Sequence, residues 1–394
     1  MKQNIAKRLY EDLRRETVYG PVIVPSGGTY SSIFAWDSGW NYFWLKNLSE
    51  EAAAAELMTL FRTAEEDGKI PHETVYEKKS RYSPLRRLQL RLLRDTFDSS
   101  GTSVFIDPPV YLWAAADLLE TAKGLSEADT HFIRTAADKK IAWIKRSRTI
   151  PSLPAPFDRL PVLLHPLESG TDLSPSFDRI YRGLPGLLLS MLTIQNGMKE
   201  EDWALSGSIP KRPARLVFDL TFLSFYLLSL QKFEGLDDEL KGDFFESFYN
   251  PETKAFESWY IDRGRLRRTA NPTFSSMLPF LADITDNGTA KRAVARHCLP
   301  GGTFWRGKLP CFNNAEKSRK SPHLWRGSCS WMNMNYCHYL LLNKYGYIEE
   351  AAKLSAAVRE IVSESSLPEY FNAFSLEPGG ASGFSWNGLA DSMV

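Results

Sequence analysis

Apolar residues recur at intervals of three and four along most of the chain, and strand-like alternation of apolar and polar residues is rare. This spacing is typical of helices that bury one face. Ser49 and Ser126 precede two such runs as N-cap residues, and Gly68 stops the first of them. The pattern predicts helices over residues 4–16, 36–47, 50–67, 107–122, 126–146, 176–197, 214–233, 236–248, 274–284, 331–344, 347–363 and 385–394.

Helices in this number, joined as hairpins, favour an all-α fold in which six hairpins close into a toroid, an (α/α)6 barrel. An α-solenoid would have the same periodicity, but the chain has no fixed sequence repeat. No linker divides residues 1–394, so we expect one domain. Long loops in a compact domain are usually functional, and we expect them at one end of the barrel. They are rich in proline, glycine and aromatic residues and cover residues 17–36, 66–84, 148–175, 299–330 and 365–385.

Charge and composition argue against several classes of partner. Lys and Arg together number 48 and Asp and Glu 47, so nothing global indicates nucleic acid or an anionic membrane. No apolar run approaches the ~18 residues of a membrane span, and the first residues lack the apolar core of a secretion signal. The cysteines have no metal-site spacing and are typical of reduced cytosolic thiols: Cys298, Cys311, Cys329 and Cys337. We therefore expect a cytoplasmic protein without metal or cofactor, whose oligomeric state is left open.

Residues 81–94 carry a local cluster of basic side chains among leucines: Arg81, Arg86, Arg87, Arg91 and Arg94. Such a cluster fits a phosphate or membrane patch. The rest of the chain offers no basic surface to extend it, so a solvated helix face is the simpler interpretation.

The segment 165–178, HPLESGTDLSPSFD, concentrates acidic side chains beside turn residues. Gly170 permits backbone angles that a side chain disfavours, and Ser174-Pro175 has the form of a helix start. Asp172 is therefore expected on a strained loop just before a helix and directed into a cavity. Acidic residues also cap helices, so this segment alone leaves a capping role open.

The run ESGTDLSPSFD resembles the ESG-x-D-x-SP-x-(W/F)-D segment of the clan G inverting α-glycosidases, which have an (α/α)6 barrel. This clan includes glycoside hydrolase family 63, the trehalases, and the short bacterial mannosylglycerate and glucosylglycerate hydrolases. The resemblance implies that Asp172 is the general acid. Leu167 stands where the family tends to have tryptophan.

A sugar subsite needs an aromatic face for the pyranose ring and a carboxylate for its hydroxyls, and Trp36-Asp37 supplies both. An aromatic core helix with Asp37 as its N-cap would contain the same residues. The stretch is also similar to the family pattern Y-x-x-x-W-x-W-D, with a phenylalanine in place of one tryptophan. That similarity implies a wall of the sugar pocket made by Tyr30, Phe34, Trp36 and Asp37.

Residues 68–73 resemble the family's DG-x-IPH loop, which implies that His72 lies in the pocket. Asp107 stands before Pro108-Pro109 where the family usually has Gln-Pro-Pro, so a carboxylate replaces an amide that contacts sugar hydroxyls. The histidines are scattered, which favours structural roles over metal ligation: His72, His131, His165, His297, His323 and His338. Only His72 and His165 are kept as candidates for the pocket.

Trp325-Arg326-Gly327, followed by Trp331, resembles the family's WRG…W-x-N-x-N motif with one additional residue of spacing. The resemblance implies that all three large side chains contact substrate. The guanidinium of Arg326 could donate two parallel hydrogen bonds to sugar hydroxyls or to a carboxylate. An arginine paired with a buried acid inside the barrel is the alternative.

In the stretch from Leu367 to Leu389, Glu369 precedes two aromatic residues, and a glycine-rich loop leads to Trp386. This arrangement resembles the family's E-Y…FSW segment and implies that Glu369 is the general base, with Trp386 beside the substrate. Glu377 is the main competing carboxylate in the same stretch.

Inverting hydrolysis needs a protonated carboxyl that donates to the leaving oxygen and an ionised carboxylate, ~6.5–9.5 Å away, that activates water on the opposite face. Asp172 must therefore keep its proton near neutral pH. Repulsion from Glu168 is our hypothesis for how its pKa is raised, and Glu168 is included among the pocket residues. Glu369 must stay ionised within hydrogen-bond reach of a water molecule.

The sequence thus predicts an inverting exo-α-glycosidase that acts from the non-reducing end on a small soluble α-glucoside or α-mannoside. A sugar epimerase or isomerase on the same barrel would need clustered histidines, and a non-catalytic carbohydrate-binding protein would have lost one of the two acids. Motifs of zinc proteases, P-loop nucleotide hydrolases and serine hydrolases are absent from the sequence.

Overall fold

The computed structural model describes residues 4–76, 102–183, 185–186, 216–269, 272–315 and 322–394. Helices dominate these residues. The α-helices are α1 Ile5–Leu13, α2 Ala35–Leu48, α3 Glu50–Arg62, α5 Val110–Thr121, α6 Glu127–Arg148, α7 Asp178–Tyr181, α9 Leu220–Phe233, α10 Asp238–Phe248, α11 Asn287–Cys298, α12 Met332–Lys344 and α13 Ile348–Ser363. The 3-10 helices are η3 Pro166–Ser169, η4 Pro175–Phe177, η6 Phe274–Ala282 and η7 Ser385–Ser392.

Short antiparallel strands join parts of the loops, so the expectation of an all-α fold is corrected to a helical fold with small sheets. In the buried pairs, such as β3 with β4, loop backbone that is out of reach of water must pair its N–H and C=O groups. The pairs are β1 Arg14–Thr17 with β2 Gly20–Ile23, β3 Ile33–Phe34 with β4 Glu73–Thr74, and β6 Tyr249–Asn250 with β7 Ala255–Phe256. The three-stranded sheets are β5 Val217–Phe218, β8 Trp259–Asp262 and β9 Arg265–Arg268, and β10 Cys329–Trp331, β11 Tyr370–Asn372 and β12 Pro378–Gly379.

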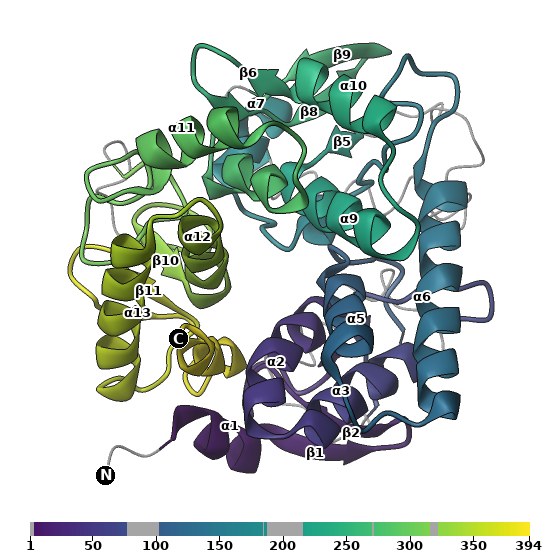
Figure 1. Ribbon diagram of the computed structural model, residues 1–394, viewed down its shortest axis with the longest axis vertical. Helices are drawn as coiled ribbons and strands as arrows, with labels where there is room; N and C mark the ends of the chain where they lie inside the picture. Colours follow the sequence, from purple (N-terminus) through teal and green to yellow (C-terminus); the bar gives the residue numbers. More distant parts are fainter. Residues whose placement is uncertain (1–3, 77–101, 184, 187–215, 270–271, 316–321) are drawn as a thin grey trace.

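The central helical elements contact one another in a closed circuit (Figure 1). α2 packs against α5, α5 against α9, and α9 against η6; η6 packs against α12, α12 against η7, and η7 again against α2. α3, α6 and α13 lie outside this circuit, where they contact α2, α5 and α12 respectively. α1 contacts η7, which brings the two ends of the described chain together.

Burial separates the helices of the circuit from the helices outside it. Every residue of α2 from Ala35 to Leu45 is buried, and so is every residue of α9 from Leu220 to Leu230. A helix that is apolar on all sides is stable only where neighbours cover all of it. The outer helices α3 and α13 instead have a buried face and an exposed face, and α3 begins at Ser49, whose Oγ accepts from Ala52 N–H at 3.1 Å.

The predicted helices are largely present, but several details are corrected. The single helix over residues 176–197 is wrong in its described part, because α7 ends at Tyr181 and Arg182 adopts a left-handed φ of 59°. The segments at 274–284 and 385–394 form 3-10 helices; in η6, Pro279 has no N–H to donate. α11 is absent from the predicted set, because its start is polar and its buried side chains are mostly small.

The cluster of arginines at residues 81–94 and the predicted helical residues 187–197 lie outside the described residues. Within the described ranges, none of the helices has both the length and the apolar character needed to cross a bilayer.

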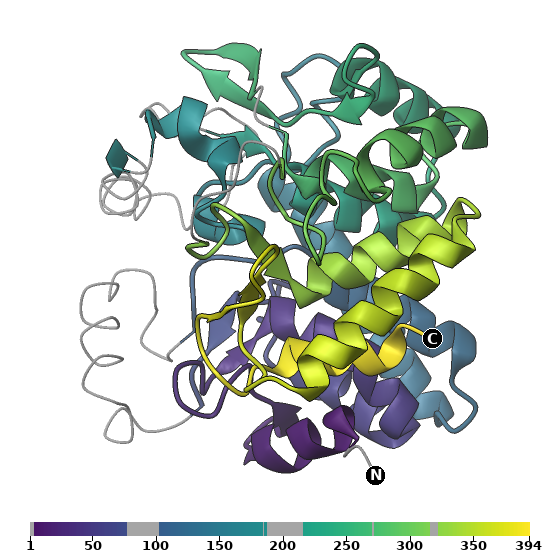
Figure 2. The same cartoon turned by 90° about the vertical axis from the view of Figure 1, so that its left-hand side faces the viewer.

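Loops from distant parts of the chain gather on one side of the circuit (Figure 2). The loop before α2 and the loop between β11 and η7 both lie on this side. Their backbones are also joined directly, since Ser385 N–H donates to Pro25 C=O at 2.9 Å. Residues that are hundreds of positions apart in sequence can therefore line one cavity.

Candidate active site

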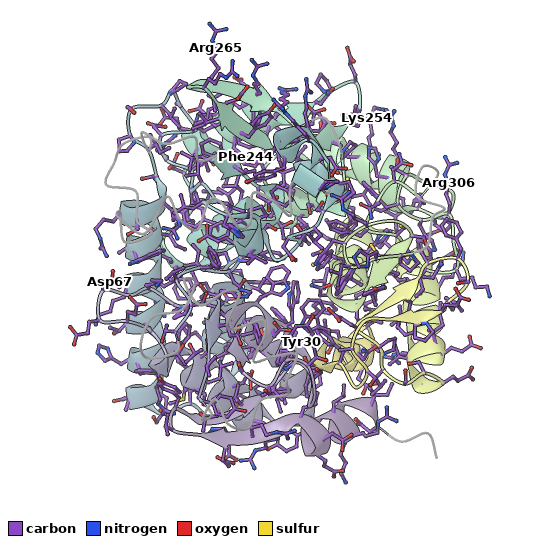
Figure 3. The ribbon with its side chains drawn as sticks, turned by 180° about the vertical axis from the view of Figure 1, so that it is seen from behind. Tyr30, Asp67, Phe244, Lys254, Arg265 and Arg306 are labelled. Carbon is purple, nitrogen blue, oxygen red and sulfur yellow. The ribbon has the colours of Figure 1, made fainter. Side chains whose placement is uncertain are left out.

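A cavity of about 190 Å³ lies where these loops meet. It is smaller than the roughly 300–1,000 Å³ typical of sites for drug-sized ligands, so it suits one small polar molecule. Tyr30, labelled in Figure 3, marks its position near the middle of the molecule. The lining residues are Pro25, Tyr30, Phe34, Trp36, Asp37, His72, Asp107, Leu167, Gly170, Asp172, Trp325, Trp331, Glu369, Phe384 and Trp386.

The structure brings most of the proposed site residues into this cavity. Those that line it are Tyr30, Phe34, Trp36, Asp37, His72, Asp107, Asp172, Trp325, Trp331, Glu369 and Trp386. Glu168 and Arg326 are not among the lining residues. The sequence argument did not assign four lining residues as site residues, although three belong to motifs that it discussed: Pro25, Leu167, Gly170 and Phe384.

Asp172 projects from the loop between η3 and η4. Gly170 precedes it with a φ of +66°, and a Cβ at this position would lie 2.9 Å from the ring of Trp36. Only glycine therefore fits between this loop and the indole. Burial raises the pKa of Asp172 to about 6, against the opposing effects of its own backbone N–H and of His72, while Asp107 adds to the rise.

The hypothesis that Glu168 raises the pKa of Asp172 is corrected by this geometry. Glu168 is fully buried and forms an ion pair with Arg148 at 2.8 Å. It also accepts from the backbone N–H groups of Leu164 at 2.8 Å and Ile106 at 3.3 Å. The like-charged neighbour of Asp172 is Asp107, and Glu168 acts as an internal anchor for the loop that carries the acid.

Glu369 is held by the glycine-rich loop that follows it. Its backbone N–H donates to Ala381 C=O at 2.7 Å, and its Oε2 accepts from Ala381 N–H at 2.9 Å. Its Oε1 accepts from the hydroxyl of Tyr30 at 3.4 Å. Burial raises the pKa of Glu369, the N–H of Ala381 and the hydroxyl of Tyr30 oppose this rise, and the charge of Asp172 adds to it.

The competing carboxylate, Glu377, lies elsewhere. Its side chain is exposed, does not line the cavity, and accepts from Ser375 Oγ at 3.0 Å. Between the two candidates from this stretch, only Glu369 reaches the same cavity as Asp172.

Asp37, Asp107 and His72 form the polar floor of the cavity. His72 Nδ1 lies 2.7 Å from Asp107 Oδ1, and Asp107 Oδ2 accepts from Trp36 N–H at 2.9 Å. Burial and the nearby Asp107 raise the pKa of Asp37 well above its ordinary value. Burial opposes a charge on His72, but the surrounding carboxylates outweigh this effect and its pKa is raised.

Tryptophans make up another part of the cavity lining. Trp325 and Trp331 stack with ring centroids 4.0 Å apart, and Trp331 lies 5.7 Å from Trp386. Trp386 in turn packs edge-on against Trp36 at 6.4 Å. The cavity thus combines apolar ring faces with carboxylates, the two features that a pyranose requires.

Arg326 is paired with an acid, as in the alternative considered from the sequence, but that acid, Asp178, is half-buried and not buried. Its guanidinium forms a two-pronged ion pair with Asp178, one arm of which measures 3.1 Å. This pair ties the loop before β10 to the start of α7, close to the segment that carries Asp172. Arg326 therefore braces the site, because its charge is already matched by a carboxylate.

His165, the other histidine candidate, also lies behind the cavity. Its ring stacks on Phe105 with centroids 4.5 Å apart, and its Nδ1 accepts from Leu167 N–H at 3.2 Å. In the part of the chain that the structure describes, no group of three or more His, Cys, Asp or Glu residues is arranged to hold a metal ion.

A carboxylate-lined cavity with tryptophan walls in a helical fold fits the chemistry of a class of protein, the glycoside hydrolases, and a family match shows that class. Residues 30–227 and 228–387 match the family described as the mannosylglycerate hydrolase MGH1-like glycoside hydrolase domain. The chain belongs to this family. The resemblance inferred from the sequence motifs is thereby confirmed, as is the prediction of a glycoside hydrolase.

Individual relatives match over nearly the whole chain. A mannosylglycerate hydrolase of Thermus thermophilus is 24% identical over 409 residues, which cover 93% of this chain and 95% of that protein. The mannosylglycerate hydrolase MGH1 of Selaginella moellendorffii is 24% identical over 424 residues, which cover 94% of this chain and 81% of that protein. A crystal structure of the GH63 mannosylglycerate hydrolase from Thermus thermophilus in complex with glucose has a TM-score of 0.76 at 21% identity and covers 100% of this chain and 99% of that one. This similarity shows a common fold.

Proposed function

We propose that this chain is an inverting exo-α-glycosidase, with Asp172 as general acid and Glu369 as general base. The observation that carries the proposal is the meeting of these two carboxyl groups, from segments far apart in sequence, at one small cavity whose surroundings raise the pKa of each. A buried carboxyl with a raised pKa keeps its proton and can donate it to the leaving oxygen. A carboxylate that accepts two hydrogen bonds keeps more of its charge and can take a proton from water.

The reaction would proceed in a single displacement. Asp172 donates its proton to the glycosidic oxygen while the bond from that oxygen to the anomeric carbon breaks. A water molecule beside Glu369 attacks the anomeric carbon from the opposite face, and Glu369 takes one of its protons. Trp325, Trp331 and Trp386 offer ring faces to the sugar, and Asp37 offers a carboxylate to its hydroxyls.

An (α/α)6 barrel made of residues 1–394 as one domain is part of this proposal. The closed circuit of contacts from α2 through η7 and back to α2 supports it. One large cluster of buried apolar side chains, which extends from Ile5 to Met393, supports one domain.

The proposed substrate is a small soluble α-glucoside or α-mannoside, cleaved from its non-reducing end in the cytoplasm. The cavity volume favours one sugar unit over an oligosaccharide. The relatives named above are mannosylglycerate hydrolases, and one of their structures holds glucose, which supports a hexoside. Leu167 and Phe34 both line the cavity, where the family tends to have tryptophan at each place, so the aglycone is to be found by screening.

The test is proton NMR of the products while the purified protein cleaves α-glucosyl and α-mannosyl glycerates, disaccharides and aryl glycosides. An inverting enzyme releases the β-anomer first, and the α-anomer appears later by mutarotation. Early α-anomer would contradict inversion. A changed free sugar would indicate an epimerase or isomerase, and saturable binding of these glycosides without turnover would indicate a binding protein.

A further inference from the structure

His72 and Asp107 form an ion pair at the floor of the cavity that the proposed acid and base do not account for. The distance from His72 Nδ1 to Asp107 Oδ1 is 2.7 Å. Both residues line the cavity, and the Asp107 side chain is 1% exposed whereas that of His72 is 24% exposed, so the imidazole is the more accessible of the two groups. A hydrogen bond of this length on one nitrogen fixes the orientation of the ring.

The backbone around the pair is equally fixed. His72 N–H donates to Phe105 C=O at 2.8 Å, and Ala35 N–H donates to His72 C=O at 3.1 Å. The second carboxylate oxygen of Asp107 accepts from Trp36 N–H at 2.9 Å. The edge of the ring of Phe34 packs against the imidazole at 5.5 Å. Three segments of the chain, around residues 34–36, 72 and 105–107, therefore hold the side chains of His72 and Asp107 in one arrangement.

The other ring nitrogen, Nε2, has no hydrogen-bond partner among the described residues, and His72 lines the cavity. Its role depends on the charge of the ring. In a neutral imidazole whose Nδ1–H donates to Asp107, Nε2 is an acceptor, whereas in an imidazolium it is a donor. The groups that face the ring decide between these states.

Those groups are acidic on every side. Asp107 lies on the segment before α5, Asp37 in the first turn of α2, and Asp172 on the loop after η3. Each favours the charged form of His72 when it is ionised, and Asp107, which is in contact with the ring, has the largest effect of the three. Glu369, on the loop before β11, lines the same cavity. Within the described residues, His72 is the one lining residue that can carry a positive charge.

We infer that Asp107 is a positioning residue that holds His72 as an imidazolium, and that the Nε2–H of His72 is a charged hydrogen-bond donor to a hydroxyl of the sugar in the cavity. The inference rests on the proposed sugar substrate but not on which carboxylate is acid or base. The inference gives a role to Asp107, which stands where the family usually has glutamine. A neutral amide at this position would not stabilise a positive charge on His72, whereas a carboxylate does.

The first experiment measures the charge of His72 directly. Long-range ¹H–¹⁵N NMR spectra of the full chain distinguish an imidazolium from either neutral tautomer, and the His72→Gln variant identifies the signal among the six histidines. We expect both ring nitrogens of His72 to be protonated at pH 7. In Asp107→Asn, the titration midpoint should move to lower pH by about one unit or more, since an opposite charge in contact shifts a pKa by about 1–3 units.

Asparagine suits this test because its carbonyl oxygen can still accept from Trp36 N–H. The matched control is Glu56→Gln, which removes another buried carboxylate that accepts a backbone N–H, from Ile23 at 2.7 Å, outside the cavity. This control should leave the His72 titration unchanged. A neutral His72 at pH 7 in the unaltered protein would overturn the inference, and so would an unchanged midpoint in Asp107→Asn.

The second experiment asks whether the charge reaches the sugar. With monodeoxy analogues of a cleaved glycoside, His72→Gln should lower kcat/KM about 10–100-fold for the full sugar and much less for the analogue that lacks the contacted hydroxyl. The Asp107→Asn and His72→Gln losses should not add, because both act through one donor. Equal losses for all analogues would contradict the inference. If no glycoside is hydrolysed, the proposed function fails, but the NMR titration and sugar binding by the same variants still decide this inference.

Discussion

The segment that carries Asp172 and the segment that carries Glu369 reach one cavity with different kinds of support. The loop that carries Asp172 is anchored by the buried ion pair between Arg148 and Glu168. In the same loop, Gly170 packs closely against the ring of Trp36. The base-bearing segment is anchored by strand pairing, with β11 between β10 and β12. Among the described residues, no neighbouring segment gives the Asp172 carboxyl a hydrogen-bond donor. The Glu369 carboxylate has two donors, Ala381 N–H from the loop that follows it and the hydroxyl of Tyr30 from the loop before α2.

This difference shows how two carboxyl groups in one cavity can take opposite roles. Burial raises the pKa of both. Hydrogen bonds to the charged form oppose burial, and they are placed around Glu369 by its neighbours. In the proposed mechanism, the hydrogen bonds from Ala381 N–H and the hydroxyl of Tyr30 therefore favour Glu369 as the group that takes a proton and leave Asp172 as the group that gives one.

Removal of the base should have the largest effect. Glu369→Gln keeps the shape of the side chain but removes the group that takes a proton from water, so we expect kcat to fall by about 10²–10⁴-fold on every glycoside. Steady-state kinetics with a natural glycoside and an aryl glycoside measure the fall in kcat. Glu377→Gln, on the same loop but exposed, is the matched control and should retain full activity. Similar losses in both variants would contradict the assignment.

Removal of the acid should have an effect that depends on the leaving group. Asp172→Asn should lower kcat by about 10²–10⁴-fold for glycosides whose leaving oxygen must be protonated. Substrates with very good leaving groups need little protonation and should lose much less activity. The ratio of the two losses is the measurement, and an equal loss on both kinds of substrate would remove Asp172 from the role of acid.

Breaking the buried ion pair between Arg148 and Glu168 should lower the free energy of unfolding. Arg148→Met leaves Glu168 charged and unpaired in the core, which should cost about 3–5 kcal/mol in the free energy of unfolding. Lys145→Met on the same helix breaks an exposed pair with Glu234 and should cost no more than about 1 kcal/mol. Denaturant unfolding compares the two variants. Adding Glu168→Gln to Arg148→Met should recover part of the loss, and if it recovers none, the ion pair is not the cause.

The smallest expected effect is the dependence of kcat/KM on pH. On each side of the optimum, kcat/KM should change about tenfold per pH unit. The pKa of Asp172 is raised to about 6, so the acid is protonated below that pH, and kcat/KM should fall as the pH rises through it. Glu369 must be ionised, and since its pKa is also raised, activity should be lost on the acid side above the ordinary range of a glutamate. In Asp172→Asn, assayed with a good leaving group, the fall near pH 6 should disappear. Its persistence would assign that limb to another group.

Helix periodicity and motif order predicted much of this molecule, because both are local properties of the chain. The spacing of apolar residues by three and four indicated the helices α2 and α9, although both also contain polar residues. Asp172, Glu369 and the tryptophans were singled out through short motifs. Glu168 shows where such reasoning fails. A spacing of four residues brings two side chains to one face only within an α-helix. Here η3 ends at Ser169, Gly170 turns the chain in a left-handed conformation, and Glu168 pairs with Arg148.

By itself, then, the sequence determined that the chain is helical, where most of its helices run, and which acidic and aromatic residues carry the family's motifs. Only the tertiary structure decided that the first and last helical elements meet, that Asp172 and Glu369 share one cavity, that Arg326 is paired with Asp178, and that His72 is paired with Asp107. The physical reason is that helix formation depends on neighbouring residues, whereas the protonation and pairing of a buried group depend on whatever distant segment packs against it.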